Sequence, residues 1–176
     1  SPEFAERAHI VFMGGALAVP GNVNACVEAN ISQDPEAADI MVRHGKDVTM
    51  IGLDVTLQTL LTYEETRKWR EYGTLAGQLL ADATDYYIKA YEATAPELGG
   101  CGLHDPLAVG VAIDPTLVTL LPINLKVDLE GPTRGRTIGD ETRMGESATT
   151  RVAVAVDAPR FLTEFMTRVG KVAAGL

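Results

Sequence analysis

The fold is decided by residues 11–38, VFMGGALAVPGNVNACVEANISQDPEAA. The stretch begins as a short apolar strand, breaks at Gly14-Gly15, and stays polar until Asp34-Pro35 starts a helix. Between the strand and the helix lie a carboxylate and three carboxamides, on Asn22, Asn24, Glu28 and Asn30. A carboxylate accepts hydrogen bonds from two vicinal hydroxyls and an amide both donates and accepts, so these side chains suit a ligand rich in hydroxyl groups.

The expected position of these side chains in the fold also favours a binding site. Open α/β sheets bind ligands beyond the carboxyl ends of their strands, which is where residues 14–30 are expected. The same residues would also suit an ordinary polar loop in which Asn and Asp side chains make local turns. Their spacing alone leaves both interpretations open.

Outward from this stretch, the chain alternates between strands and helices. Residues 8–13 and 47–53 are apolar enough for buried parallel strands, and a helix over residues 37–44 lies between them. This order predicts a right-handed crossover in an open, mainly parallel sheet with flanking helices, an α/β fold.

The rest of the chain fits one domain, residues 1–176. Helices are expected over residues 63–70, 74–91, 107–113 and 160–169. Residues 117–127 predict a strand, and residues 131–137 a turn that leads into a second strand, which gives a β-hairpin near the C-terminal end. Residues 151–156 predict a further strand.

Composition excludes several classes of protein. The 176 residues are 46% hydrophobic and carry a formal net charge of −9, which fits a soluble domain and argues against a nucleic-acid partner. Cys26 and Cys101 form no metal-binding pattern, so we expect free thiols. Because no apolar run reaches the length of a membrane span and no signal peptide is recognised, we expect no membrane partner and a cytoplasmic location.

Two further groups of polar residues follow predicted structural elements. Asp54-Val55-Thr56 follows the second strand, where the simplest expectation is that Asp54 or Thr56 caps the next helix. His104-Asp105-Pro106 follows a glycine-rich segment. An imidazole can exchange a proton near neutral pH and a carboxylate can bind a hard cation, although a structural His and an Asp-Pro turn are equally ordinary.

Taken together, these motifs resemble the inosine-uridine preferring nucleoside hydrolase family. The resemblance rests on Met13-Gly14-Gly15, on Asn22, Glu28 and Asn30 with DPEAA at residues 34–38, on GLDVT at residues 52–56, and on HDP at residues 104–106. Members of this family are calcium-dependent enzymes of purine and pyrimidine salvage that cut the N-glycosidic bond between ribose and base. The resemblance implies their Rossmann-like fold and a nucleoside substrate.

The resemblance also implies roles for individual residues. Asn22, Glu28 and Asn30 would bind the ribose hydroxyls, with Met13 beside the sugar. His104 would serve the leaving base and Asp105 would bind Ca²⁺. Tyr91 is expected on the side of the base, and Tyr87 and Glu92 are further candidates; which base is accepted stays open.

One motif of the family is not found. Its aspartate-rich DxDxGxDD motif, which supplies the water-activating base and further calcium ligands, has no counterpart here, because Asp82 and Asp85 fall within a predicted helix and Asp140-Glu141 follow a hairpin. The chain therefore resembles the C-terminal part of a family member, and we expect it to be catalytically complete only with the N-terminal part, in a homodimer or homotetramer. The alternatives are a non-catalytic ribose-binding or nucleoside-binding module and an assembly module that uses an exposed sheet edge.

Overall fold

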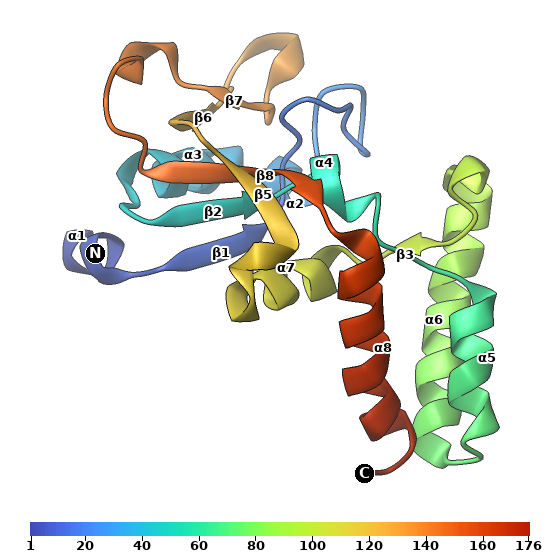
Figure 1. Ribbon diagram of the computed structural model, residues 1–176. Coiled ribbons are helices and arrows are strands. Elements are labelled where there is room, and N and C mark those ends of the chain that lie inside the picture. The colour runs from blue at the N-terminus through green and yellow to red at the C-terminus, as the bar shows by residue number, and fades with distance from the viewer.

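A four-stranded sheet forms the centre of the computed structural model, which describes residues 1–176 (Figure 1). Its strand order is β1-β2-β8-β5, with bounds β1 (Ile10–Met13), β2 (Val48–Ile51), β8 (Thr150–Val156) and β5 (Val118–Pro122). β1, β2 and β8 run parallel, and β5 is antiparallel to β8. The predicted open, mainly parallel sheet is confirmed.

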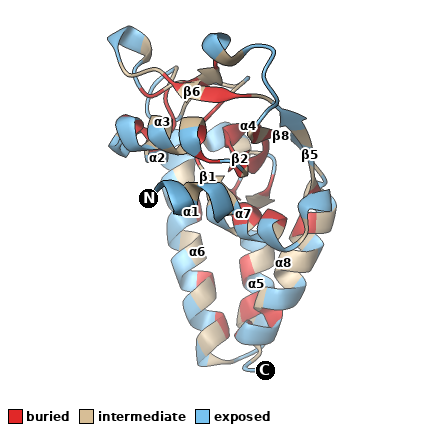
Figure 2. Ribbon diagram, turned by 90° about the vertical axis from the view of Figure 1, so that its left-hand side faces the viewer, coloured by how far each residue is buried: buried red, intermediate tan, exposed pale blue.

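The two faces of the sheet support separate apolar clusters. All four residues of β2 are buried, as the apolar run in the sequence predicts. Because side chains alternate along a strand, Met50 faces one cluster and Ile51 the other. The Met50 cluster packs beneath helix α3 and strand β6, while the larger Ile51 cluster extends into the helices on the opposite face (Figure 2).

Eight α-helices surround the sheet, and most begin at a capping side chain. Their bounds are α1 (Pro2–Arg7), α2 (Ala29–Gln33), α3 (Pro35–His44), α4 (Leu53–Thr56), α5 (Tyr63–Glu71), α6 (Leu75–Thr94), α7 (His104–Ile113) and α8 (Ala158–Ala173). Asp34 caps α3 with Pro35 at its first position, as expected, and Asp157 caps α8. At the start of α5, Thr62 and Glu65 form a capping box.

Helices α5, α6 and α8 form a group that projects from the sheet (Figure 1). Trp69 of α5 is only 1% exposed and packs against Phe165 of α8. At the far end, the Thr74 hydroxyl caps α6 and donates to the carbonyl of Ala173. The group gives α6 a fixed position, so that the last turns of that helix reach the carboxyl end of the sheet.

The expected single strand over residues 117–127 is instead two strands. β5 ends at Pro122, and β6 (Leu125–Val127) leaves the sheet to pair with β7 (Thr137–Gly139) as the predicted hairpin. The bend lies at Asn124, whose buried Oδ1 accepts hydrogen bonds from Arg143 Nη2 and Thr149 N. The prediction of one strand was wrong because these side-chain contacts turn the chain where the apolar pattern continues.

Other features complete the fold. Two short strands, β3 (Leu60–Leu61) and β4 (Cys101–Gly102), pair next to the carboxyl end of the sheet. Strand β1 lies at an edge of the main sheet. Its four residues are only partly buried, so the prediction of a buried strand there was wrong, because β1 has a neighbouring strand on one side alone. No helix is both long and apolar enough to cross a membrane. Cys26 and Cys101 are free, as predicted.

Candidate functional site

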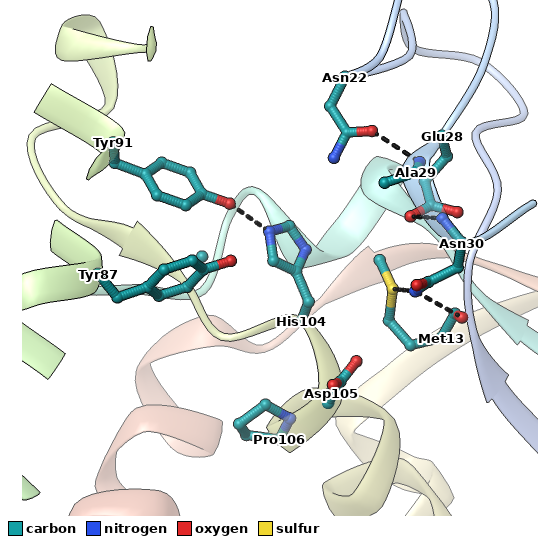
Figure 3. Close-up of a pocket in the computed structure, with 11 residues that line it drawn as sticks. Met13, Asn22, Glu28, Ala29, Asn30, Tyr87, Tyr91, His104, Asp105 and Pro106 are labelled. Carbon is teal, nitrogen blue, oxygen red and sulfur yellow. Dashed lines mark hydrogen bonds between the residues drawn. The ribbon is translucent and has the colours of Figure 1, made fainter. Parts of the chain in front are cut away.

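A cavity of about 320 Å³ opens at the carboxyl end of β1, between helices α2, α6 and α7 (Figure 3). It brings together all seven residues predicted for the site. The residues that line it are Met13, Asn22, Glu28, Ala29, Asn30, Tyr87, Tyr91, Gly102, His104, Asp105 and Pro106. The volume lies within the range of small-molecule sites, roughly 300–1,000 Å³.

Glu28 is the most buried of the predicted sugar-binding residues, with 2% of its surface exposed. One carboxylate oxygen accepts from the backbone N–H groups of Gly15 and Ile31, and the other accepts from that of Asn30. Glu28 is therefore the N-cap of α2, a helix that the sequence analysis missed. Three of the roughly four lone-pair positions of a carboxylate are used, which leaves one for a ligand.

Asn22 and Asn30 each have one free polar atom. Asn22 Oδ1 accepts from Ala29 N, which leaves its NH₂ group facing the cavity (Figure 3). Asn30 Nδ2 donates to the carbonyl oxygen and the sulfur of Met13, at 3.4 and 3.1 Å, which leaves Oδ1 as an acceptor. The pair offers one donor and one acceptor to a hydroxyl-rich ligand.

Two groups outside the predicted site hold the loop that carries Asn22. Both carboxylate oxygens of Asp54 accept from backbone N–H groups, those of Leu17 and Ala18. The expectation that Asp54 caps the next helix was wrong, because the N-cap of α4 is Gly52. Arg136 donates to three carbonyl oxygens of the same loop, those of Leu17, Val19 and Cys26.

On the other side of the cavity, Tyr91, His104 and Thr56 form a hydrogen-bonded row. His104, the first residue of α7, has Nε2 at 2.5 Å from Tyr91 Oη and Nδ1 at 2.7 Å from Thr56 Oγ1. Gly102 leaves room for the ring, since a Cβ atom there would lie 2.6 Å from His104 Nε2. Thr56 was named in the sequence only as a potential helix cap; nothing in the pattern showed that it would meet a residue 48 positions away.

Burial sets the ionisation of this row. It lowers the pKa of His104, while the carboxylates of Glu28 and Asp105 act in the opposite direction. Burial and the neighbouring Tyr87 raise the pKa of Tyr91, so its hydroxyl stays protonated at neutral pH. The row thus presents neutral groups that can donate and accept hydrogen bonds.

Of the two further candidates for the base side, Tyr87 lies at the cavity and Glu92 does not. Tyr87 lines the cavity and its ring meets that of Tyr91 edge to face, with centroids 5.1 Å apart. Glu92, in contrast, is exposed, does not line the cavity, and lies near Tyr63. Tyr87 and Tyr91 point the same way because they are four residues apart on α6.

Asp105 is the only site carboxylate without a protein partner. Its side chain is exposed at the mouth of the cavity and makes no hydrogen bond or ion pair. Calcium takes six to eight oxygen ligands, and no group of three or more His, Cys, Asp or Glu side chains is placed to hold a metal ion. Asp105 fits one position of such a shell, but the residues of this chain alone do not form the site.

Comparison of the sequence with known proteins shows the family of this chain. Residues 1–163 match the model of the inosine-uridine preferring nucleoside hydrolase family. The chain belongs to this family. An inosine-uridine preferring nucleoside hydrolase of Leishmania major is 36% identical over 163 residues, and a pyrimidine-specific ribonucleoside hydrolase of Escherichia coli O157:H7 is 34% identical over 154 residues. These matches cover 91% and 86% of the chain but 51% and 49% of the relatives, so the chain spans about half of their length.

Solved structures of nucleoside hydrolases share the fold. A purine-preferring ribonucleoside hydrolase from Gardnerella vaginalis is 67% identical and superposes with a TM-score of 0.97, over 100% of this chain and 56% of that one. A plant nucleoside hydrolase, 29% identical, gives a TM-score of 0.85 over 100% of this chain and 57% of that one. The predicted nucleoside hydrolase fold is confirmed.

Proposed function

We propose that this chain supplies the sugar side and the leaving-group side of an enzyme that hydrolyses the N-glycosidic bond of ribonucleosides to ribose and free base. The observation that carries the proposal is the opposition of two sets of groups in one cavity: the free amide atoms of Asn22 and Asn30 on one wall, and the His104–Tyr91 pair on the other. A nucleoside has hydroxyls at one end and a base at the other, and this arrangement matches both ends.

The sugar side acts on the charge and shape of the transition state. As the base departs, the ribose ring flattens toward an oxocarbenium-like cation. Asn22 donates to, and Asn30 accepts from, ribose hydroxyls, while the remaining lone pair of Glu28 accepts a further hydroxyl. Contacts that fit the flattened ring better than the ground state raise the rate as well as the affinity.

The leaving-group side acts on the base. Negative charge develops on the base as the bond breaks, and a hydrogen-bond donor at that point stabilises it. His104 and Tyr91, which are hydrogen-bonded to each other, are the groups of this chain placed to supply that donor. Tyr87 supplies an aromatic wall beside them.

Activation of the attacking water needs residues that this chain does not contain. Residues 1–176 hold one free site carboxylate, that of Asp105, so the proposal places the water-activating base and the other Ca²⁺ ligands in the part of the relatives' length that this chain does not span. When bound, Ca²⁺ would orient the water and the ribose. Hydrolysis by residues 1–176 alone is not expected, and we propose that the complete enzyme is a cytoplasmic homo-oligomer.

A binding module without catalysis needs less than this site contains. Ribose recognition would be satisfied by Asn22, Glu28 and Asn30, and would not require a partly buried His held by two hydroxyls on the opposite wall. The His104–Tyr91 pair therefore favours the enzyme over the binding module. It does not select a base, and the relatives themselves include purine-preferring and pyrimidine-specific enzymes.

The test is hydrolysis of a nucleoside panel by the full-length protein. Inosine, adenosine, uridine and cytidine are assayed for ribose release, with calcium and after its removal by a chelator. We expect hydrolysis of at least one nucleoside that depends on calcium. Nucleoside binding without ribose release from any of the four would refute the proposal in favour of the binding module.

A matched pair of variants ties the activity to this cavity. Asn22→Asp keeps the acceptor that Ala29 N uses but removes the free NH₂ group, so turnover should fall. Asn24→Asp makes the same change in the same loop, where Oδ1 accepts from Cys26 N and Val27 N outside the cavity, so turnover should be kept. Equal losses in both variants would contradict the assignment of Asn22.

A further inference from the structure

The hydroxyl of Thr56 has a single hydrogen-bond partner. Thr56 is fully buried in α4, with 0% of its surface exposed, and its Oγ1 contacts only His104 Nδ1, at 2.7 Å. Its backbone carbonyl accepts from Thr59, but no carbonyl accepts the hydrogen of its own hydroxyl. His104 Nδ1 is therefore the one acceptor available to the hydroxyl hydrogen of Thr56.

The hydrogen count fixes the direction of this bond. If Nδ1–H donated to Thr56, the Thr56 hydrogen would be buried without an acceptor, a situation that folded proteins avoid. If Thr56 donates, Nδ1 is the acceptor and every hydrogen is used. The ring then carries its hydrogen on Nε2, because a neutral imidazole has one N–H group.

The same count of hydrogens gives the direction of the bond between His104 and Tyr91. With its hydrogen on Nε2, His104 donates to Tyr91 Oη at 2.5 Å, so the Tyr91 oxygen is the acceptor in that bond. The hydrogen of Tyr91 is then not used by His104. Tyr91 lines the cavity, and its hydroxyl, at the tip of the side chain, points toward His104 (Figure 3).

We propose that Thr56 is a positioning residue of the leaving-group side: its buried hydroxyl donates to His104 Nδ1, which directs Nε2–H toward Tyr91 and leaves the Tyr91 hydrogen free to face the departing base. The proposal rests on the proposed function and assigns the direction of its hydrogen bonds. Tyr91 is then the group that touches the base, and His104 acts behind it as a donor that strengthens the Tyr91 hydroxyl.

The direct test reads the ring nitrogens of His104. In the full-length protein labelled with ¹⁵N-histidine, the imidazole ¹⁵N shifts distinguish a bare nitrogen from one that carries hydrogen, and loss of a signal in His104→Gln identifies the residue. We expect a bare Nδ1 and a protonated Nε2. A protonated Nδ1, alone or together with a protonated Nε2, would overturn the proposal. This measurement does not depend on activity.

The kinetic test separates positioning from structure. Thr56→Val removes the hydroxyl at nearly constant volume, and we expect kcat on nucleosides to fall on the order of tenfold with little change in KM, as for the loss of one hydrogen bond that acts in the transition state. Thr56→Ser should restore kcat. On p-nitrophenyl riboside, whose leaving group needs no donor, Thr56→Val should have little effect.

A control variant makes the same change elsewhere. Thr66 is equally buried, in α5 away from the cavity, and its hydroxyl donates to the carbonyl of Tyr63. Thr66→Val should leave kcat unchanged. The proposal fails if Thr56→Val matches this control, or if it slows both substrates equally. If the wild-type protein hydrolyses no nucleoside, the proposed function fails, and the ¹⁵N result alone decides the role of Thr56.

Discussion

Replacement of Glu28 by glutamine tests whether this residue supports the site as well as binding sugar. The change keeps the shape of the side chain and turns one carboxylate oxygen into an NH₂ group. In the best orientation the remaining oxygen keeps the bonds from Gly15 N and Ile31 N, and the NH₂ group faces Asn30 N. The N–H group of Asn30, which is partly buried, then loses its acceptor.

The expected size follows from that single loss. An unsatisfied donor that is fully buried destabilises by about 1–3 kcal/mol, and this partly buried one belongs in the lower part of that range, about 1–2 kcal/mol. At roughly 2–4 °C per kcal/mol for a domain of this size, the melting temperature should fall by about 2–8 °C. The assay is thermal unfolding followed by circular dichroism, with turnover measured well below the transition. Turnover should also fall, because α2 carries Asn30.

Glu36→Gln is the control for the loss of charge. Glu36 lies in the first turn of the neighbouring helix α3, is exposed, and pairs with Arg134 at the surface. Exposed ion pairs contribute little, about 0–1 kcal/mol, so its melting temperature should stay near that of the wild type. If Glu28→Gln melts together with Glu36→Gln, the three backbone bonds do not hold α2 and the reasoning is wrong.

Three further variants divide the site by role. Asn30→Ala removes an exposed side chain that bonds only Met13, so kcat should fall on the order of 10–10³-fold with little change in melting temperature; a change confined to KM would contradict this. His104→Ala should lose about 10²–10⁴-fold in rate on nucleosides and far less on p-nitrophenyl riboside. Asp105→Asn should not change stability but should weaken calcium binding, measured by calorimetry on the full-length protein, and slow both substrates.

The sheet and most helices could be predicted because their signals are local. Strand β2 is a short run of apolar residues interrupted only by Thr49, and α3 begins at an Asp-Pro pair, so hydrophobic pattern and capping were sufficient. Helix α2 has no such signal: its five residues, Ala29–Gln33, include Asn, Ser and Gln, and its cap is a glutamate. It forms because Glu28 also bonds Gly15, a contact that closes the loop between them.

The requirement for glycine at position 15 is a second feature whose cause the sequence does not show. The Gly15 φ of +80° favours glycine, and a Cβ atom at this position would lie only 2.7 Å from Met50 Sδ. The sequence marks Gly14-Gly15 as the end of a strand, but not which neighbour excludes a side chain. The Arg136 bonds to the Asn22 loop are equally hidden, because they join residues more than 100 positions apart.

The candidate site therefore divides into residues that chemistry reveals and residues that only the fold reveals. Asn22, Asn30 and Asp105 each present a polar atom that no other part of the chain uses, and such residue types between a strand and a helix can be recognised in the sequence. Thr56, in contrast, looks like an ordinary buried threonine until the fold brings it to His104. Since a neutral imidazole has one hydrogen, a single hydroxyl behind the ring is enough to decide which nitrogen faces Tyr91. The hydrogen-bond direction on the leaving-group side thus depends on a residue whose own type carries no catalytic signal.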